Sequence, residues 1–77
     1  MIEFTDGSLG MWTVYDHPTD VPDKFVARLF KMDKPTATTL EADTLDELRW
    51  LLDKAFPGMV RLSRSPYDEP QIVEVWL

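Results

Sequence analysis

Apolar and polar residues alternate with a period of two in several short stretches of this chain, which is the pattern of strands with one buried face. The clearest stretch is 24–32, where Phe25, Ala27 and Leu29 fall on one side. Further strands are predicted at 2–5, 9–15, 36–42, 59–62 and 71–77.

Residues typical of turns separate these strands. The segment 16–23 contains two prolines and three aspartates, a composition that opposes any regular element, so it is predicted to be a loop. Turns are predicted at 6–8 and 33–35, and a second loop is predicted at 63–70.

One segment follows a helical period instead. Thr44 and Glu47 have the spacing of a capping box, and Pro57-Gly58 is expected to end the helix. The apolar side that should face the sheet consists of Leu45, Leu48, Leu51, Leu52, Ala55 and Phe56.

Strands on both sides of a single helix predict an α+β fold. We expect an antiparallel sheet of four to five strands covered by one helix, in the order ββ(β)αββ. A chain of 77 residues has room for one domain, which we assign to 1–77.

Composition narrows the classes of function. The chain has no cysteine and one histidine, which argues against disulfides, thiolate metal sites and any cofactor held by such ligands. Its formal charge of −6 disfavours direct binding to nucleic acid. No apolar run reaches the length of a membrane span and the first residues do not resemble a signal peptide, so we expect a cytoplasmic protein that does not enter a membrane.

The loop 16–23 is the best candidate for a chemical site. An imidazole and three carboxylates in one loop suit a divalent metal or a histidine base. The candidate residues are Asp16, His17, Asp20 and Asp23. Their spacing matches no metal motif, and short carboxylates also serve as turn residues, so we expect a structural loop with no catalytic residue and no metal. The alternative is a small enzyme or metal-binding protein that uses this loop with Arg28 or Arg64.

The sheet face opposite the helix is predicted to be apolar and uncovered. If the side chains at 73, 75 and 77 face the helix, those at 72, 74 and 76 face away. The predicted apolar face then consists of Val26, Phe30, Met32, Ile72 and Trp76. Such a face favours contact with protein, with a homodimer as the first expectation, unless the first strands or the loops fold over it.

Trp50 is a further candidate for partner contact. At about 100° per residue it projects away from the apolar side of the helix, between Asp46 and Lys54. The acidic neighbours Asp46, Glu47 and Asp53 favour a basic partner surface. The competing interpretation is that Lys54 or another part of the chain covers the indole.

Two segments resemble small uncharacterised proteins of bacteria and their phages. The first is Trp-Thr-Val-Tyr-Asp-His-Pro at 12–18, followed by Pro22-Asp23 and by Phe-Val-Ala-Arg at 25–28. The second is Asp-Glu-Pro at 68–70 leading into Ile-Val-Glu-Val-Trp-Leu at 72–77. The resemblance implies a self-contained bacterial-type domain, with a regulatory or host-directed role conceivable, and carries over no activity and no site. We therefore expect a small non-catalytic protein-interaction module.

Overall fold

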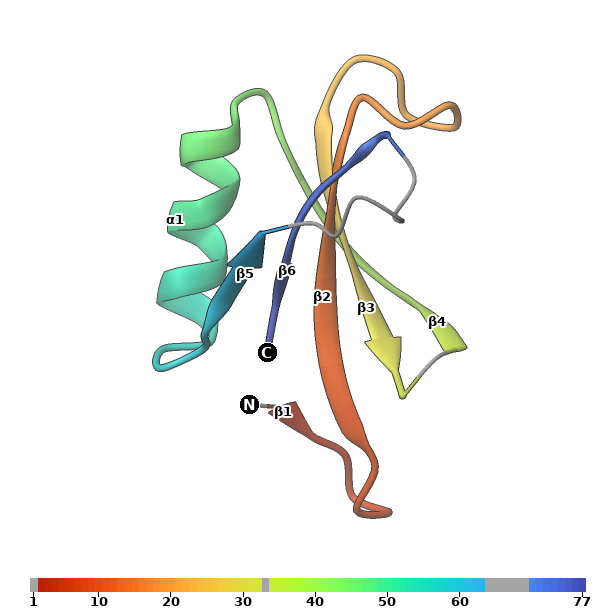
Figure 1. Ribbon diagram of the computed structural model, residues 1–77, viewed down its shortest axis with the longest axis vertical. Helices are drawn as coiled ribbons and strands as arrows, with labels where there is room; N and C mark the ends of the chain where they lie inside the picture. Colours follow the sequence, from red (N-terminus) through yellow and green to blue (C-terminus); the bar gives the residue numbers. More distant parts are fainter. Residues whose placement is uncertain (1, 33, 64–69) are drawn as a thin grey trace.

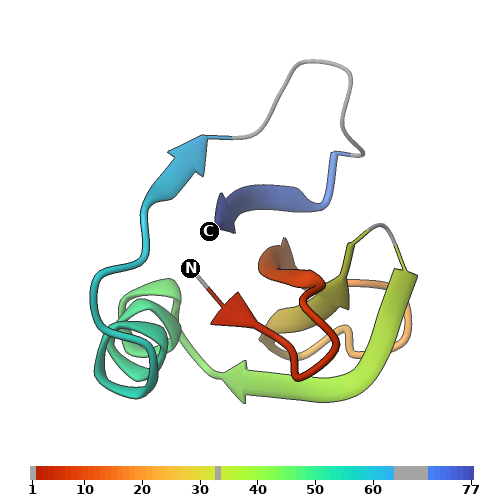
Figure 2. The ribbon, with the colours of Figure 1, turned by 90° about the horizontal axis from the view of Figure 1, so that it is seen from below.

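A curved antiparallel sheet with one helix packed on its inner side forms the described part of the chain in this computed structural model, which covers residues 2–32, 34–63 and 70–77 (Figures 1 and 2). The elements in chain order are β1 (Ile2–Glu3), β2 (Leu9–Asp16), β3 (Phe25–Lys31), β4 (Lys34–Ala42), α1 (Leu45–Ala55), β5 (Arg61–Ser63) and β6 (Ile72–Trp76). The predicted α+β class with one covering helix is confirmed.

The strands follow the order β4-β3-β2-β6-β5, and β1 pairs with the first residues of β2. All of these pairings are antiparallel. β2 lies at the centre, between β3 and β6. In Figure 2 the sheet bends around one side, and α1 lies within the bend.

The helix begins and ends where the sequence indicates. The Thr44 side chain accepts a 3.2 Å hydrogen bond from the Glu47 backbone N–H, which caps the first turn. The helix ends at Ala55, and Gly58 follows in a left-handed conformation with φ of 88°. In the described ranges, no helix is long and apolar enough to cross a membrane.

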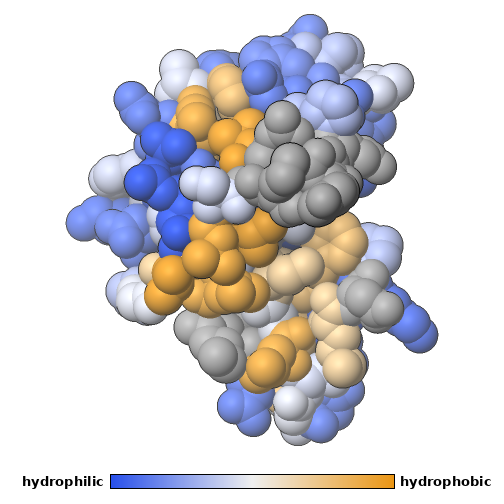
Figure 3. All heavy atoms as spheres, viewed as in Figure 1, coloured by the Kyte–Doolittle hydropathy of each residue, from blue (hydrophilic) through white to orange (hydrophobic). Residues whose placement is uncertain are grey.

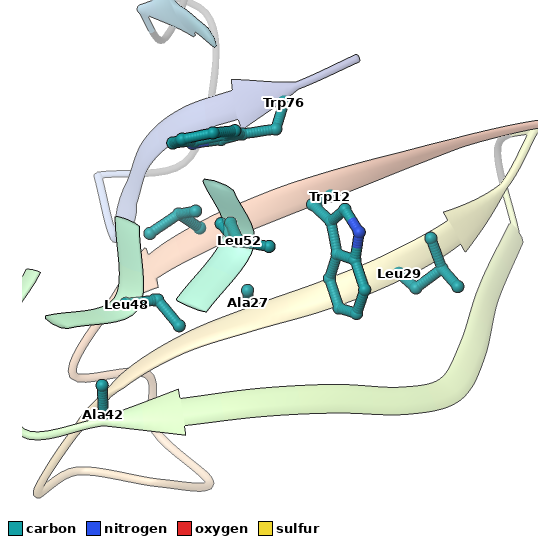
Figure 4. Close-up of a cluster of buried hydrophobic side chains, with 8 residues drawn as sticks. Trp12, Ala27, Leu29, Ala42, Leu48, Leu52 and Trp76 are labelled. Carbon is teal, nitrogen blue, oxygen red and sulfur yellow. The ribbon is translucent and has the colours of Figure 1, made fainter. Parts of the chain in front are cut away.

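The main core lies between α1 and the sheet. Figure 4 shows side chains from α1, β2, β3, β4 and β6 converging there. Its buried members are Trp12, Val14, Ala27, Leu29, Ala42, Leu48, Leu52 and Trp76. The predicted inner face of β3 is confirmed, because Ala27 and Leu29 belong to this cluster and Phe25 packs against it.

The predicted orientation of the last strand holds for Ile72 and for Val73, which packs against the core, but is wrong for the residues that follow. Trp76 pairs with Trp12 on the side that faces the helix and is buried there, whereas Val75 pairs with Thr13 on the opposite side. The register of β2 against β6 shifts between Val14 and Tyr15. This irregularity resets the alternation, so Ile72 faces away from the helix as predicted, but Val75 does so too.

Two predicted loops differ in detail. The turn after β3 is tighter than expected, because β4 already begins at Lys34, and Met32 has a left-handed φ of 58°. The loop 17–24 is closed by a 3.1 Å hydrogen bond from the His17 N–H to the Lys24 carbonyl. Most of the predicted loop 63–70, residues 64–69, lies outside the described residues.

Candidate interaction surfaces

The face of the sheet turned away from α1, here called the outer face, carries a row of apolar side chains. Val60 and Leu77 exchange backbone hydrogen bonds of 2.7 and 2.9 Å, and the pairing of Trp12 with Trp76 sets Leu77 beside Met11. Met11 pairs with Phe30, which pairs with Pro35. The apolar row therefore consists of Val60, Leu77, Met11, Phe30 and Pro35.

Much of this row is open to solvent. Val60 is 59% exposed and Leu77 38% exposed, while Met11 and Phe30 are half-buried. Leu62, which is 44% exposed, extends the surface along β5. Figure 3 shows apolar side chains gathered at the centre of this view, over the ends of β5 and β6, and continuing towards the lower end of β2. A contiguous exposed apolar area of this kind is typical of a protein-contact surface.

The predicted apolar face is only partly realised. Phe30 belongs to the apolar row, Met32 is exposed at the end of β3, and Ile72 is half-buried on the outer face. Val26 lies on this face too, between Tyr15 and Glu41, but is only 1% exposed. Trp76 lies on the other side of the sheet, so this predicted contact residue is a core residue instead.

Trp50 lies on the outer side of α1. It is 60% exposed, and Lys54 Nζ lies 6.0 Å from the centroid of its ring. The exposure predicted from the helical pattern is confirmed, and Lys54 lies near the ring but does not cover it, which the competing interpretation would require. The nearby Asp46 side chain extends into solvent.

The four candidate residues of the loop do not converge on one point. His17 contacts the Asp16 carboxylate through Nδ1 and meets the ring of Phe25 at an edge, with centroids 5.0 Å apart. Asp20 forms an ion pair with Arg28, and Asp23 is exposed. Over the described ranges, no group of three or more histidine, cysteine, aspartate or glutamate side chains is arranged to hold a metal ion.

A pocket of about 390 Å³ lies beside this loop on the outer face. Its lining residues are Tyr15, Pro18, Thr19, Asp20, Arg28 and Gln71. The guanidinium carbon of Arg28 lies 5.4 Å from the centroid of the Tyr15 ring. The hydrogen bond from Arg28 lowers the pKa of Asp20, so this carboxyl group stays ionised and balances the charge of Arg28. The arrangement is suited to holding a small polar molecule rather than to proton transfer.

A buried carboxylate, which sequence reasoning missed, connects the helix to the last strand. Glu74 is 3% exposed, and its Oε1 accepts a 2.7 Å hydrogen bond from Arg49 Nη2. Its Oε2 accepts a 2.7 Å hydrogen bond from the indole N–H of Trp76. The same Arg49–Glu74 hydrogen bonding raises the pKa of Arg49. Both oxygens are thus satisfied, which is typical of a structural ion pair.

Comparison with known proteins finds no family model, no curated protein and no solved structure that matches this chain. The resemblance to small bacterial and phage proteins therefore stays a prediction. The surfaces of the molecule are the remaining basis for a functional proposal.

Proposed function

We propose that this chain is a small non-catalytic protein-interaction domain that forms a two-fold homodimer through the outer face of its sheet. The observation that carries the proposal is the apolar row, which crosses from Val60, just before β5, to Pro35 on β4 without a charged side chain among its five members. A sheet face of this composition is normally covered by another layer.

A second copy of the chain is the occupant that best fits this face. The chain carries a net charge of −6, which repels a second copy over most of its surface. The apolar row is an exception, because two copies can meet there without placing carboxylates against each other. A two-fold axis lets each row cover its equivalent, and small domains without disulfides commonly gain stability through oligomerisation.

Binding of a small ligand beside the 16–23 loop is the second candidate function. The pocket of about 390 Å³ favours it, and it corresponds to the enzyme or metal-binding alternative based on that loop. We place it second because Arg28 and Asp20 in the pocket wall already pair with each other.

Sedimentation equilibrium at micromolar concentration tests the dimer. We expect the parent chain to sediment as a dimer and Val60→Lys to sediment as a monomer, because the substitution puts an ammonium group in the apolar row. Ala55→Lys is the matched control, since it adds the same charge at an exposed position on α1, and it should stay dimeric. A parent chain that remains monomeric at tens of micromolar would refute the proposal.

A further inference from the structure

The outer side of α1 carries the exposed indole of Trp50, with the ammonium group of Lys54 nearby. Trp50 is 60% exposed, and the ammonium group of Lys54 lies 6.0 Å from its ring centroid, at the outer limit of a cation–π contact. An exposed tryptophan with so loose an internal partner leaves most of its ring available. Tryptophan is also the residue type most enriched at interface hot spots.

Carboxylates border the indole on both sides. At about 100° per residue, Asp46 and Asp53 lie roughly 40° and 60° from Trp50 in one direction around the helix. Glu47 lies roughly 60° away in the other direction, next to Lys54. All three carboxylates belong to exposed residues. The nearby cation Arg49 contacts the buried Glu74 at 2.7 Å, and its Nη1 lies 3.9 Å from Asp46 Oδ1, so it offsets Asp46 only in part and leaves Glu47 and Asp53 without a contribution from that side.

We propose that this surface of α1, formed by Trp50, Asp46, Glu47 and Asp53, binds a cationic segment of a partner protein. An arginine or lysine of that segment displaces Lys54 from the indole, and the surrounding carboxylates receive the neighbouring basic groups. Arginine suits the site best, because its planar guanidinium stacks on an aromatic face while it pairs with carboxylates.

The proposal goes beyond dimer formation, because α1 and the apolar row are on opposite sides of the sheet. Both surfaces can be occupied together, and a dimer then offers two copies of the helical surface. Two sites on one assembly strengthen binding to a partner with repeated basic segments.

The test uses a peptide of alternating arginine and glycine as probe, titrated into the full chain at low ionic strength. Trp12 and Trp76 are buried, so the emission that acrylamide quenches arises chiefly from Trp50. We expect the peptide to protect this emission and to bind detectably by calorimetry, whereas a peptide of alternating glutamate and glycine does neither.

Variants distinguish binding at this site from a general effect of the negative net charge. Trp50→Ala should lower the affinity at least tenfold, and Lys54→Gln should raise it several-fold because the internal competitor is gone. The double variant Asp46→Asn with Asp53→Asn removes two charges from the site, and Glu41→Gln removes one charge from the other face of the sheet as a control. We expect the loss of log affinity in the double variant to be more than twice the loss in the control. Unchanged affinity in Trp50→Ala, weaker binding in Lys54→Gln, or equal losses per removed charge at all three acids would overturn the proposal.

The outcome is independent of the dimer. A monomeric Val60→Lys variant should bind the peptide with the same affinity per chain as the parent. If the parent proves monomeric, the helical surface is still testable in the same way.

Discussion

Arg49 and Glu74 are joined by three contacts between α1 and β6: Arg49 Nη2 lies 2.7 Å from Oε1, and Nε lies 3.2 and 3.3 Å from the two carboxylate oxygens. This bidentate geometry is the strong form of a charged hydrogen bond. Because α1 follows β4 and β6 pairs with β2, the ion pair holds together two segments that are distant in the sequence.

Removing the cation should destabilise the fold. We expect Arg49→Met to lower the free energy of unfolding by about 2–3 kcal/mol, because it leaves the Glu74 charge buried and unpaired. This value is lower than the roughly 3–5 kcal/mol lost when a fully buried pair is broken, because the Arg49 side chain is one-third exposed. Urea unfolding at pH 7 measures the loss.

The double variant Arg49→Met with Glu74→Gln provides the control for this prediction. It removes both charges but keeps an acceptor for the indole N–H of Trp76, so it should recover most of the lost stability. A loss in Arg49→Met below about 0.5 kcal/mol would instead mean that Glu74 is adequately solvated without its partner.

Acid should weaken the fold through its surface ion pairs. Lys24 Nζ lies 2.7 Å from Asp43 Oδ1 and lowers the pKa of Asp43, as Arg28 does for Asp20. A carboxyl group with a lowered folded-state pKa stabilises the fold above its unfolded value of about 4, and this contribution is lost as the pH falls through the folded-state pKa. We expect the free energy of unfolding to decrease below about pH 4.

The variant Asp43→Asn isolates one of these groups. Its stability should vary less steeply with pH below about pH 4 than that of the parent, as urea titrations at successive pH values would show. Identical slopes for the two proteins would mean that the Lys24–Asp43 pair makes no net contribution in solution.

His17 is expected to act as a loop residue and not as a metal ligand. Its φ of 49° is in the left-handed region, and its ring rests against Phe25. Zinc, manganese and calcium should therefore leave the melting temperature unchanged, since only a site in the folded state raises it. A rise with any of these ions that His17→Ala abolishes would favour the metal-binding alternative.

Duplex DNA and RNA should not bind. The net charge of −6 and the pairing of Arg28, Lys24 and Arg49 with carboxylates leave few cations for phosphate contacts. Gel shifts at low salt with random-sequence duplex are the direct measurement. A shift of the duplex at micromolar protein concentration would contradict this prediction and would indicate a local basic patch on a protein of negative net charge.

The elements with a local signal were predictable from the sequence. The helix has a capping threonine and an apolar stripe, and β3 alternates in sequence, so the burial of Leu48 and Leu52 and the inner face of β3 follow from residue spacing. Ala55, which the same spacing assigned to the sheet side of the helix, is exposed instead. The exposure of Trp50 follows from the same helical geometry.

The candidate surface depended on contacts that no local pattern contains. Tyr15 pairs with Ile72 and Val14 with Glu74, so Val73 is an extra residue in β6, and this irregularity exchanges Trp76 for Val75 on the outer face. Glu74 is on the inner face because it pairs with Arg49 of α1, which is 25 residues away in the sequence. No local pattern in β6 indicates this contact. The sequence does indicate that Glu74 and Trp76 point to the same side of the strand, because they are two residues apart.

The two edges of the sheet have consequences for growth of the assembly. On β4, Pro35 has no backbone N–H to donate, and the pairing with β3 is irregular between Arg28 and Phe30. On the opposite edge, β5 has only the three residues Arg61–Ser63. The interruptions in the nine-residue β4 and the shortness of β5 oppose strand-by-strand addition of further chains, and the two-fold dimer proposed above, formed through the outer face, would stay closed and finite.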